Sequence, residues 1–126
     1  MKSIVLFFAL LIPVFSFAQT SEELTLKRLQ GEWMNHENFN VAHISKDKWT
    51  ASRIQVDGES EPMVYDIKIT NTLPQFPEAA EVQDKTEYIT LTSASDTRYY
   101  EIISLVGKKL GLREYPSGVL VVYEKD

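Results

Sequence analysis

The chain has no cysteine among its 126 residues. This absence excludes disulfide bridges, thiol catalysis and cysteine-ligated metals. It also excludes the lipid-modified cysteine that anchors a bacterial lipoprotein. We therefore expect the fold to be stabilised by its hydrophobic core, which a chain of this length is large enough to build.

An excess of positive charge is also missing. Thirteen Lys and Arg residues stand against 18 Asp and Glu, which gives a formal net charge of −5. The densest cationic spots are only Lys27-Arg28 and Lys108-Lys109, whereas nucleic-acid binding needs a broad basic surface that faces phosphates. We therefore expect no nucleic-acid partner, and we take the acidity to serve solubility.

Histidine is scarce too, with only His36 and His43 in the chain. They fall on neighbouring expected strands, close to Glu32 and Glu37, but their spacing matches no metal-binding motif. The chain has no Gly-x-Ser-x-Gly sequence for a nucleophilic serine. From these patterns we predict no metal, no cofactor and no enzymatic site.

The N-terminus carries the one long apolar run. A lysine precedes the uncharged segment Ile4–Phe15, and Ser16 and Ala18 place small residues at the −3 and −1 positions of a cleavage site. This is the layout of a secretory signal peptide, and the run is too short to span a bilayer comfortably. We expect residues 1–18 to be removed and residues 19–126 to form one domain, exported to the periplasm or secreted. The alternative is an uncleaved anchor.

One short helix is expected before the strands, over residues 21–30. Ser21 can cap its N-terminus, where the following acidic residues suit the positive end of a helix. Leu24 and Leu29 would form a small apolar face, and Gly31 can end the turn.

Short segments with strand character follow, alternating with turn signals. The clearest is Met63–Thr70, where apolar and polar residues alternate as on a half-buried strand. The other expected strands are 32–38, 41–45, 48–56, 87–92, 98–105, 109–114 and 119–124.

About eight consecutive strands joined mostly by hairpins predict an all-β fold. A single antiparallel up-and-down barrel is favoured, because closing the sheet removes its two exposed edges. The competing architecture, a two-sheet sandwich, needs at least one long return connection, and the only long link, 72–86, lies near the middle of the chain. A barrel of about eight strands is either filled by its own side chains or holds one small ligand.

The first expected strand begins with Gly31-Glu32-Trp33, directly after the helical segment. This Gly-x-Trp element resembles the start of the lipocalin (calycin) group, and the back half of the chain, from residue 99 onward, is similar to the closing strands of small exported bacterial lipocalin-like domains. The resemblance implies that Gly31 and Trp33 form a structural closure at one barrel end. It also implies that a cation near the last strands, Arg113 or Lys125, packs across Trp33, and that the barrel binds a small apolar molecule.

The alternation on the strands predicts which side chains face the barrel interior. An open interior would bind a ligand through an apolar lining with a few polar anchors, whereas in a filled interior the same side chains form the core. Arg53 is in phase with Trp49, so it either points inward and holds a carboxylate or reaches the rim. On strand 98–105 the pattern leaves two inner faces open, one with Tyr100 and Ile102 and the other with Tyr99, Glu101, Ile103 and Leu105. A bulge would let Ile102 and Leu105 both face inward. The candidate ligand-binding residues are Trp49, Arg53, Tyr65, Ile67, Phe76, Tyr100, Ile102, Leu112 and Tyr123.

The segment 72–86 is the longest break in the strand pattern. Pro74 and Pro77 stiffen it, and Phe76 is a large apolar side chain where solvated loops usually carry polar ones. We expect Phe76 to fold over a barrel mouth, either as a gate for a ligand or as a cap on the core.

The sequence therefore predicts an exported, monomeric, lipocalin-like barrel that binds a small hydrophobic or amphipathic molecule and is not an enzyme. The alternative is a non-enzymatic protein-interaction module with a filled barrel, which would use its outer strands or the 72–86 segment.

Overall fold

The computed structural model describes residues 20–73 and 86–125. The expected signal peptide and Phe76 lie outside these residues. The helical structure in the described part of the chain lacks the length and apolar character that crossing a membrane requires. The elements are the helix α2 (Ser21–Leu29) and the strands β1 (Gly31–Met34), β2 (Asn40–Ser45), β3 (Lys48–Gln55), β4 (Gly58–Glu59), β5 (Met63–Thr70), β6 (Tyr88–Thr92), β7 (Thr97–Val106), β8 (Lys109–Tyr115) and β9 (Leu120–Lys125).

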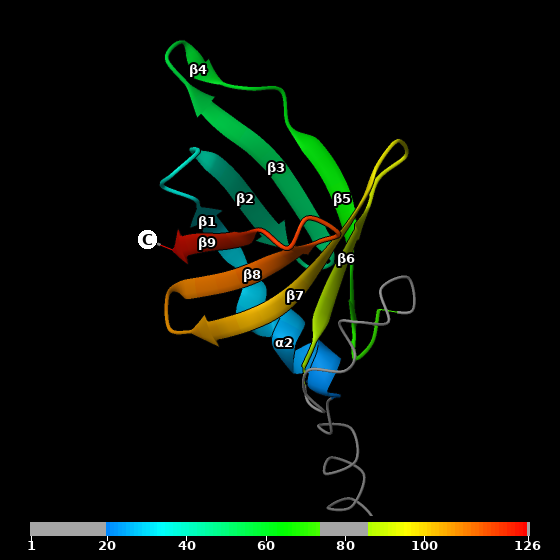
Figure 1. Cartoon of the computed structure of the whole chain (residues 1–126). Helices are drawn as coiled ribbons and strands as arrows, with labels where there is room; N and C mark the ends of the chain where they lie inside the picture. The colour runs from blue at the N-terminus through cyan, green and yellow to red at the C-terminus, as the bar shows by residue number, and fades with distance from the viewer. Residues whose placement is uncertain (1–19, 74–85, 126) are drawn as a thin grey trace, which may run out of the picture.

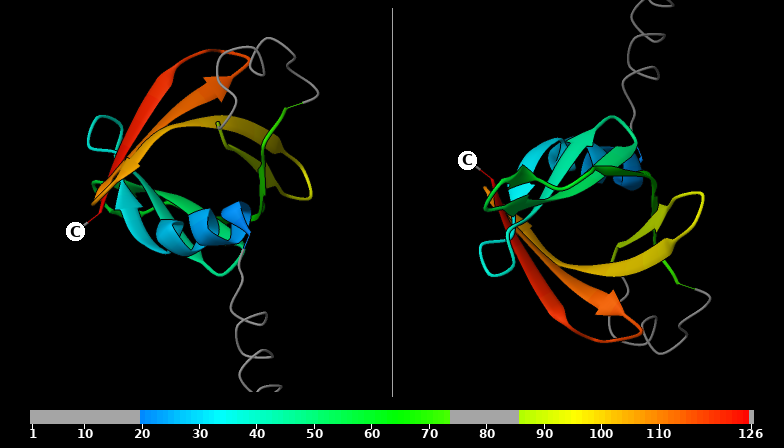
Figure 2. Two further views of the ribbon diagram at one scale, coloured as in Figure 1. Left: turned by 90° about the horizontal axis from the view of Figure 1, so that it is seen from below. Right: turned by 90° about the horizontal axis from the view of Figure 1, so that it is seen from above.

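Eight of these strands close into one antiparallel barrel (Figure 1). Strands β5 to β9 pair in chain order, β9 pairs with β1, and the ring closes through β1–β2, β2–β3 and β3–β5. Viewed along its axis, the sheet forms a continuous ring (Figure 2). The predicted up-and-down barrel is therefore confirmed, and the sandwich is not found.

Two local differences from the expected strands have clear causes. Strand β1 ends at Met34, four residues earlier than expected, because the Oδ1 atom of Asn35 accepts hydrogen bonds from the backbone N–H groups of Glu37 (2.8 Å) and Asn38 (3.4 Å) and so forms a turn. Strand β4, which lies between the expected strands 48–56 and 63–70, pairs with the end of β3 and forms a hairpin that projects above the ring in Figure 1.

The expected helix is present, but its cap and its buried face differ from the prediction. The hydroxyl oxygen of Thr20, and not that of Ser21, accepts a hydrogen bond from the backbone N–H of Glu23 at 3.1 Å. Leu29 is fully buried as expected, whereas Leu24 is half exposed and Leu26 packs against the core instead. The helix lies at the lower end of the barrel in Figure 1.

Trp33 closes the barrel at the end where α2 lies. Its side chain is fully buried, and its indole Nε1–H donates a hydrogen bond to the backbone oxygen of Leu29, the last helical residue, at 2.8 Å. The Lys125 ammonium lies 4.9 Å from the centroid of the Trp33 ring, close enough for a cation–π interaction. The expected pairing of Trp33 with a cation is therefore confirmed, and the cation is Lys125, not Arg113.

Gly31 makes room for this contact. Its φ angle is +124°, in a region that residues with a side chain rarely adopt. A Cβ atom at this position would lie 2.5 Å from Cε of Lys125. The glycine of the Gly-x-Trp element therefore serves both the backbone turn from α2 into β1 and the approach of Lys125 to Trp33.

The lower half of the barrel is filled by side chains. The expected inward-facing apolar residues on the strands all belong to one hydrophobic core or pack against it, including Leu110 and Leu112 of β8, whereas Arg53 is exposed. Strand β7, where the sequence left two inner faces open, has a register shift between Ile102 and Ser104, and Leu105 beyond it is buried. The structure therefore has the face with Tyr100 and Ile102 packed on the core, and the bulge adds Leu105 to it.

Trp33→Ala should lower the free energy of unfolding by about 3–5 kcal/mol, because it leaves a large cavity at the sealed end and removes the contacts with Leu29 and Lys125. Urea unfolding followed by circular dichroism measures this change. Val122→Ala, a truncation of an exposed residue on β9, is the control and should have little effect. An unfolding midpoint for Trp33→Ala close to that of the wild type would contradict the closure role.

Candidate functional site

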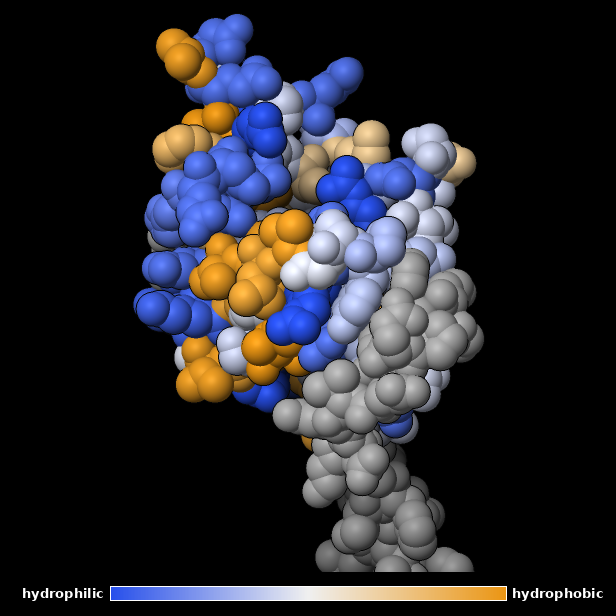
Figure 3. All heavy atoms as spheres, viewed as in Figure 1, coloured by the Kyte–Doolittle hydropathy of each residue, from blue (hydrophilic) through white to orange (hydrophobic). Residues whose placement is uncertain are grey.

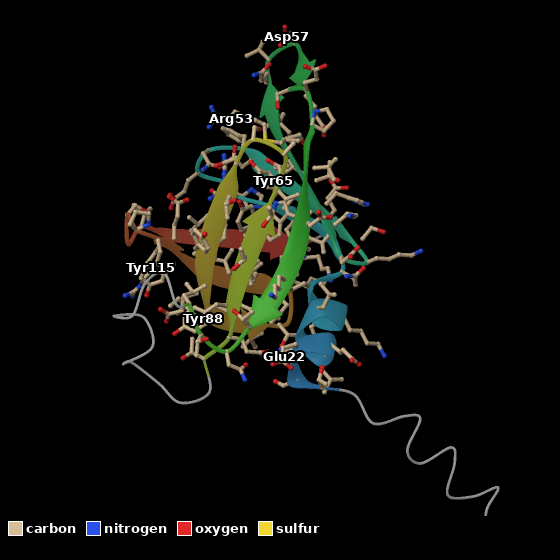
Figure 4. All side chains as sticks on the ribbon, turned by 90° about the vertical axis from the view of Figure 1, so that its right-hand side faces the viewer. Glu22, Arg53, Asp57, Tyr65, Tyr88 and Tyr115 are labelled. Carbon is tan, nitrogen blue, oxygen red and sulfur yellow. The ribbon has the colours of Figure 1, made fainter. Side chains whose placement is uncertain are left out.

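A cavity of about 310 Å³ opens at the barrel end opposite α2. This volume is at the lower limit of typical small-molecule pockets, which span about 300–1,000 Å³. Figure 4 shows Arg53 and Tyr65 toward this upper end, below the hairpin tip at Asp57, with Glu22 of α2 at the opposite end. The cavity is lined by Asn40, Val41, Trp49, Ala51, Ser52, Arg53, Ser60, Met63, Tyr65, Leu91, Arg98, Tyr100 and Tyr123.

Three aromatic side chains from β3, β7 and β9 form the floor of the cavity. The rings of Trp49 and Tyr100 are nearly parallel, with centroids 6.4 Å apart and planes inclined by 7°. Tyr123 meets Trp49 edge to face, with centroids 5.9 Å apart. Burial raises the pKa of both tyrosine hydroxyls, so Tyr100 and Tyr123 stay neutral near pH 7. The floor is therefore aromatic and uncharged.

A charged network borders one side of the cavity. Asp96, in the β6–β7 turn, accepts hydrogen bonds from Nε of Arg98 at 2.9 Å and from the hydroxyl of Tyr65 at 3.1 Å. The Arg98 guanidinium also lies over the Tyr65 ring, 5.5 Å from its centroid. These contacts link β5 and β7 to the β6–β7 turn at the cavity mouth.

The pKa values of this network follow from these contacts. The hydrogen bonds from Arg98 and then from Tyr65 lower the pKa of Asp96 below its ordinary value. Burial, followed by the hydrogen bond to Asp96, raises the pKa of Tyr65. Burial alone would lower the pKa of Arg98, but its hydrogen bonds to Asp96 and Tyr100 outweigh that effect and raise it. At neutral pH the network therefore consists of a carboxylate, a neutral phenol and a guanidinium cation.

Arg53 provides a second cation at the mouth. Its side chain is exposed, and its Nε donates a hydrogen bond to Oδ1 of Asn40 on β2 at 3.1 Å. Its backbone N–H donates to the hydroxyl of Ser60, which joins the rim to the β3–β4 hairpin. Of the two positions that the sequence left open for Arg53, the structure has the one at the rim.

Five of the nine candidate ligand-binding residues line this cavity together: Trp49, Arg53, Tyr65, Tyr100 and Tyr123. Ile67 and Leu112 are buried in the core cluster and are not among its lining residues. Phe76 lies outside the described residues.

Ile102 borders a different, smaller cleft of about 240 Å³ at the α2 end. Here the hydroxyl of Thr25 donates a hydrogen bond to the carboxylate of Glu87, and Arg28 donates to the backbone oxygen of Leu105. These bonds tie α2 to the strands beside it, which is a structural role.

Arg98 and Asp96 were not among the site residues predicted from the sequence. Arg98 is two residues before Tyr100 on a strand with period-two alternation, so the pattern contained a signal that it shares the inward face. Asp96 lies in a turn, where alternation predicts nothing about direction. The two histidines are not brought into a metal site, since the described residues contain no group of three or more His, Cys, Asp or Glu that could hold a metal ion.

Comparisons with protein-family models, with curated proteins and with solved structures give no match to this chain. The closed eight-stranded barrel is consistent with a calycin-like fold. The narrower resemblance to lipocalins stays a prediction from the Gly-x-Trp element of the sequence.

Asp96→Asn should destabilise the protein at about pH 7, and the difference from the wild type should shrink toward about pH 3. At pH values well above the ordinary Asp pKa of 3.8, the Asp96 carboxylate is ionised in both the folded and the unfolded protein, so its contacts contribute fully to the stability of the folded state. As the pH falls from 3.8 toward the lower pKa of the folded state, the unfolded chain binds the proton first and this contribution is lost.

Urea unfolding at several pH values measures the difference between the two proteins. Asp57→Asn, at the exposed hairpin tip, is the control for removing one surface carboxylate. A difference between Asp96→Asn and the wild type that stayed constant or grew at low pH would contradict the network.

Proposed function

We propose that this protein is an exported lipocalin-like binding protein that holds one small amphipathic molecule in the cavity at the open barrel end. The observation that carries the proposal is the uneven filling of the barrel. Side chains pack the half next to α2, while a cavity of about 310 Å³ with an aromatic floor and a polar rim lies in the other half. An apolar body on the floor and a polar group at the rim would satisfy both surfaces.

The size of the cavity supports a small ligand. A dry apolar cavity of about 150 Å³ is large enough to bind benzene. A space about twice as large fits a molecule with one or two rings, or a short acyl chain, together with a polar head. Long-chain lipids would extend beyond the mouth.

We propose a binding role and not catalysis, because the polar groups at the mouth have pKa values unsuited to proton transfer. The lowered pKa of Asp96 makes its carboxylate a weak base, and the raised pKa of Tyr65 makes its hydroxyl a weak acid at neutral pH. Both groups also hold Arg98 in place.

Binding of the neutral two-ring fluorophore 1-aminonaphthalene tests the proposal. The purified domain should enhance and blue-shift the emission of the fluorophore with a 1:1 stoichiometry. Ala51→Leu extends a side chain from the β3 wall into the cavity, so it should weaken binding about tenfold or more by occupying the space of the ligand. Fluorescence titration gives the affinity, and thermal unfolding checks the fold of each variant.

Val64→Leu is the matched control for this experiment. Val64 is exposed on β5 and is absent from the cavity lining, so the larger side chain there should leave the affinity unchanged. If Ala51→Leu folded normally and bound the fluorophore as well as the wild type, or if no variant bound it, ligand binding in the cavity would be contradicted.

A protein-interaction module is the second candidate. Exposed apolar side chains lie on the outer wall of the barrel on β9, on the residue before it and on the end of β7, with β8 between the two strands; Figure 3 shows this side of the molecule. Such a surface needs no cavity, so a folded protein without affinity for the fluorophore would favour this candidate. The side chains are Ile103, Val106, Val119, Leu120 and Val122.

A further inference from the structure

We propose that the ligand is a small anion with an aromatic ring, such as an arylalkanoate, with its ring on the aromatic floor and its charged group between Arg53 and Arg98. This inference rests on the proposed function and specifies its ligand class. It comes from two independent features of the cavity, the sign of its charge and the shape of its floor.

The charge of the cavity is opposite to that of the whole chain. The formal net charge of the chain is −5, yet the thirteen described residues that line the cavity include two arginines and no acidic residue. The nearby carboxylate of Asp96 contacts Arg98 through Nε, at the base of the guanidinium group. Asp96 offsets the charge of Arg98, so the charge of Arg53 remains in excess at the mouth and favours an anion there, although the protein as a whole repels one.

Both arginines are fixed by neighbouring oxygen atoms. Arg98 donates hydrogen bonds to Asp96 and Tyr100, and Arg53 donates through Nε to Asn40. A guanidinium has five N–H donors, so these contacts orient each group and leave donors for a ligand. Arginine binds carboxylates with two parallel hydrogen bonds, which gives geometric specificity as well as attraction.

The floor favours a flat ring over a flexible chain. The nearly parallel rings of Trp49 and Tyr100 present flat surfaces, and the edge-to-face contact of Tyr123 helps to hold the Trp49 ring in position. An aromatic ligand can stack on such a surface or meet it edge to face, and both contacts gain energy beyond the burial of area. A saturated ring of similar size is thicker and has no π system, so it gains only the free energy of burying its apolar surface.

Four matched compounds separate the two features. They are 3-phenylpropanoate, 3-cyclohexylpropanoate, 3-phenylpropan-1-ol and 3-cyclohexylpropan-1-ol, which differ only in ring type and in the charge of the head. Isothermal titration calorimetry with the purified domain gives the four affinities. The aryl acid should bind most tightly, about tenfold or more above the aryl alcohol and about threefold to tenfold above the cyclohexyl acid.

Arginine variants show whether the mouth recognises the charge. Arg53→Gln and Arg98→Gln should each reduce the preference for 3-phenylpropanoate over 3-phenylpropan-1-ol, while the affinity for the alcohol changes little. Lys48→Gln removes one positive charge at the other end of β3 and should leave the preference unchanged. An affinity loss that is equal for acid and alcohol would mean that the arginines act only through the fold.

The outcomes distinguish this inference from the proposed function. If 1-aminonaphthalene binds but the four compounds bind with similar affinity or not at all, the protein binds ligands and the aryl-anion inference is wrong. A preference for the cyclohexyl acid would assign an aliphatic anion and also overturn it. If neither the fluorophore nor any of the four compounds binds, the proposed function fails as well.

Discussion

The indole of Trp33 is the contact on which the rest of the barrel depends. Its N–H donates to the last carbonyl group of α2, and its ring lies under the ammonium of Lys125, the last residue of β9. One buried side chain thus joins the helix, the first strand and the last strand at the point where the ring closes. Because Trp33 occupies this end, the proposed ligand site lies at the opposite end, among the described residues that line the larger cavity.

The difference between the two barrel ends is important because an eight-stranded barrel has a narrow interior. Its interior is just wide enough to be filled by side chains or to hold one small molecule, so a few residues decide between the two. Leucine and isoleucine side chains fill the half near α2. In the other half, Ala51 is small, and Trp49, Tyr100 and Tyr123 stack together as a floor below the cavity. The same fold therefore contains a packed core and a cavity in one ring.

Most of the fold could be predicted from the sequence, because apolar and polar residues alternate with period two along the strands. This alternation predicted β5 (Met63–Thr70) with its observed bounds and the inward phase of Trp49 and Tyr65, but it left two inner faces open for β7, where a bulge buries Leu105. It could not predict the turn at Asn35 or the short pairing of β4, because both depend on hydrogen bonds between residues outside the regular pattern.

The candidate site was less predictable for the same reason. Its floor comes from strands and followed from the alternation, but the position of Arg53 depends on where β3 ends relative to the rim, which sequence spacing leaves open. Asp96 lies in a turn, 31 residues after Tyr65 in the sequence. The two side chains meet because the strands fold into a closed ring. Alternation therefore predicted the apolar half of the site, and tertiary structure supplied the charged half.

Trp33 contacts the end of α2 and Trp49 lines the cavity, so the two tryptophans allow one direct test of the central claim, that one end is sealed and the other binds a ligand. The indole N–H signals of Trp33 and Trp49 can be followed by ¹H–¹⁵N NMR during titration with 3-phenylpropanoate. We predict that the Trp49 signal shifts in a saturable manner while the Trp33 signal stays in place and exchanges slowly with solvent. Saturable shifts confined to Trp33, or no shift of Trp49 at saturating ligand, would contradict the account.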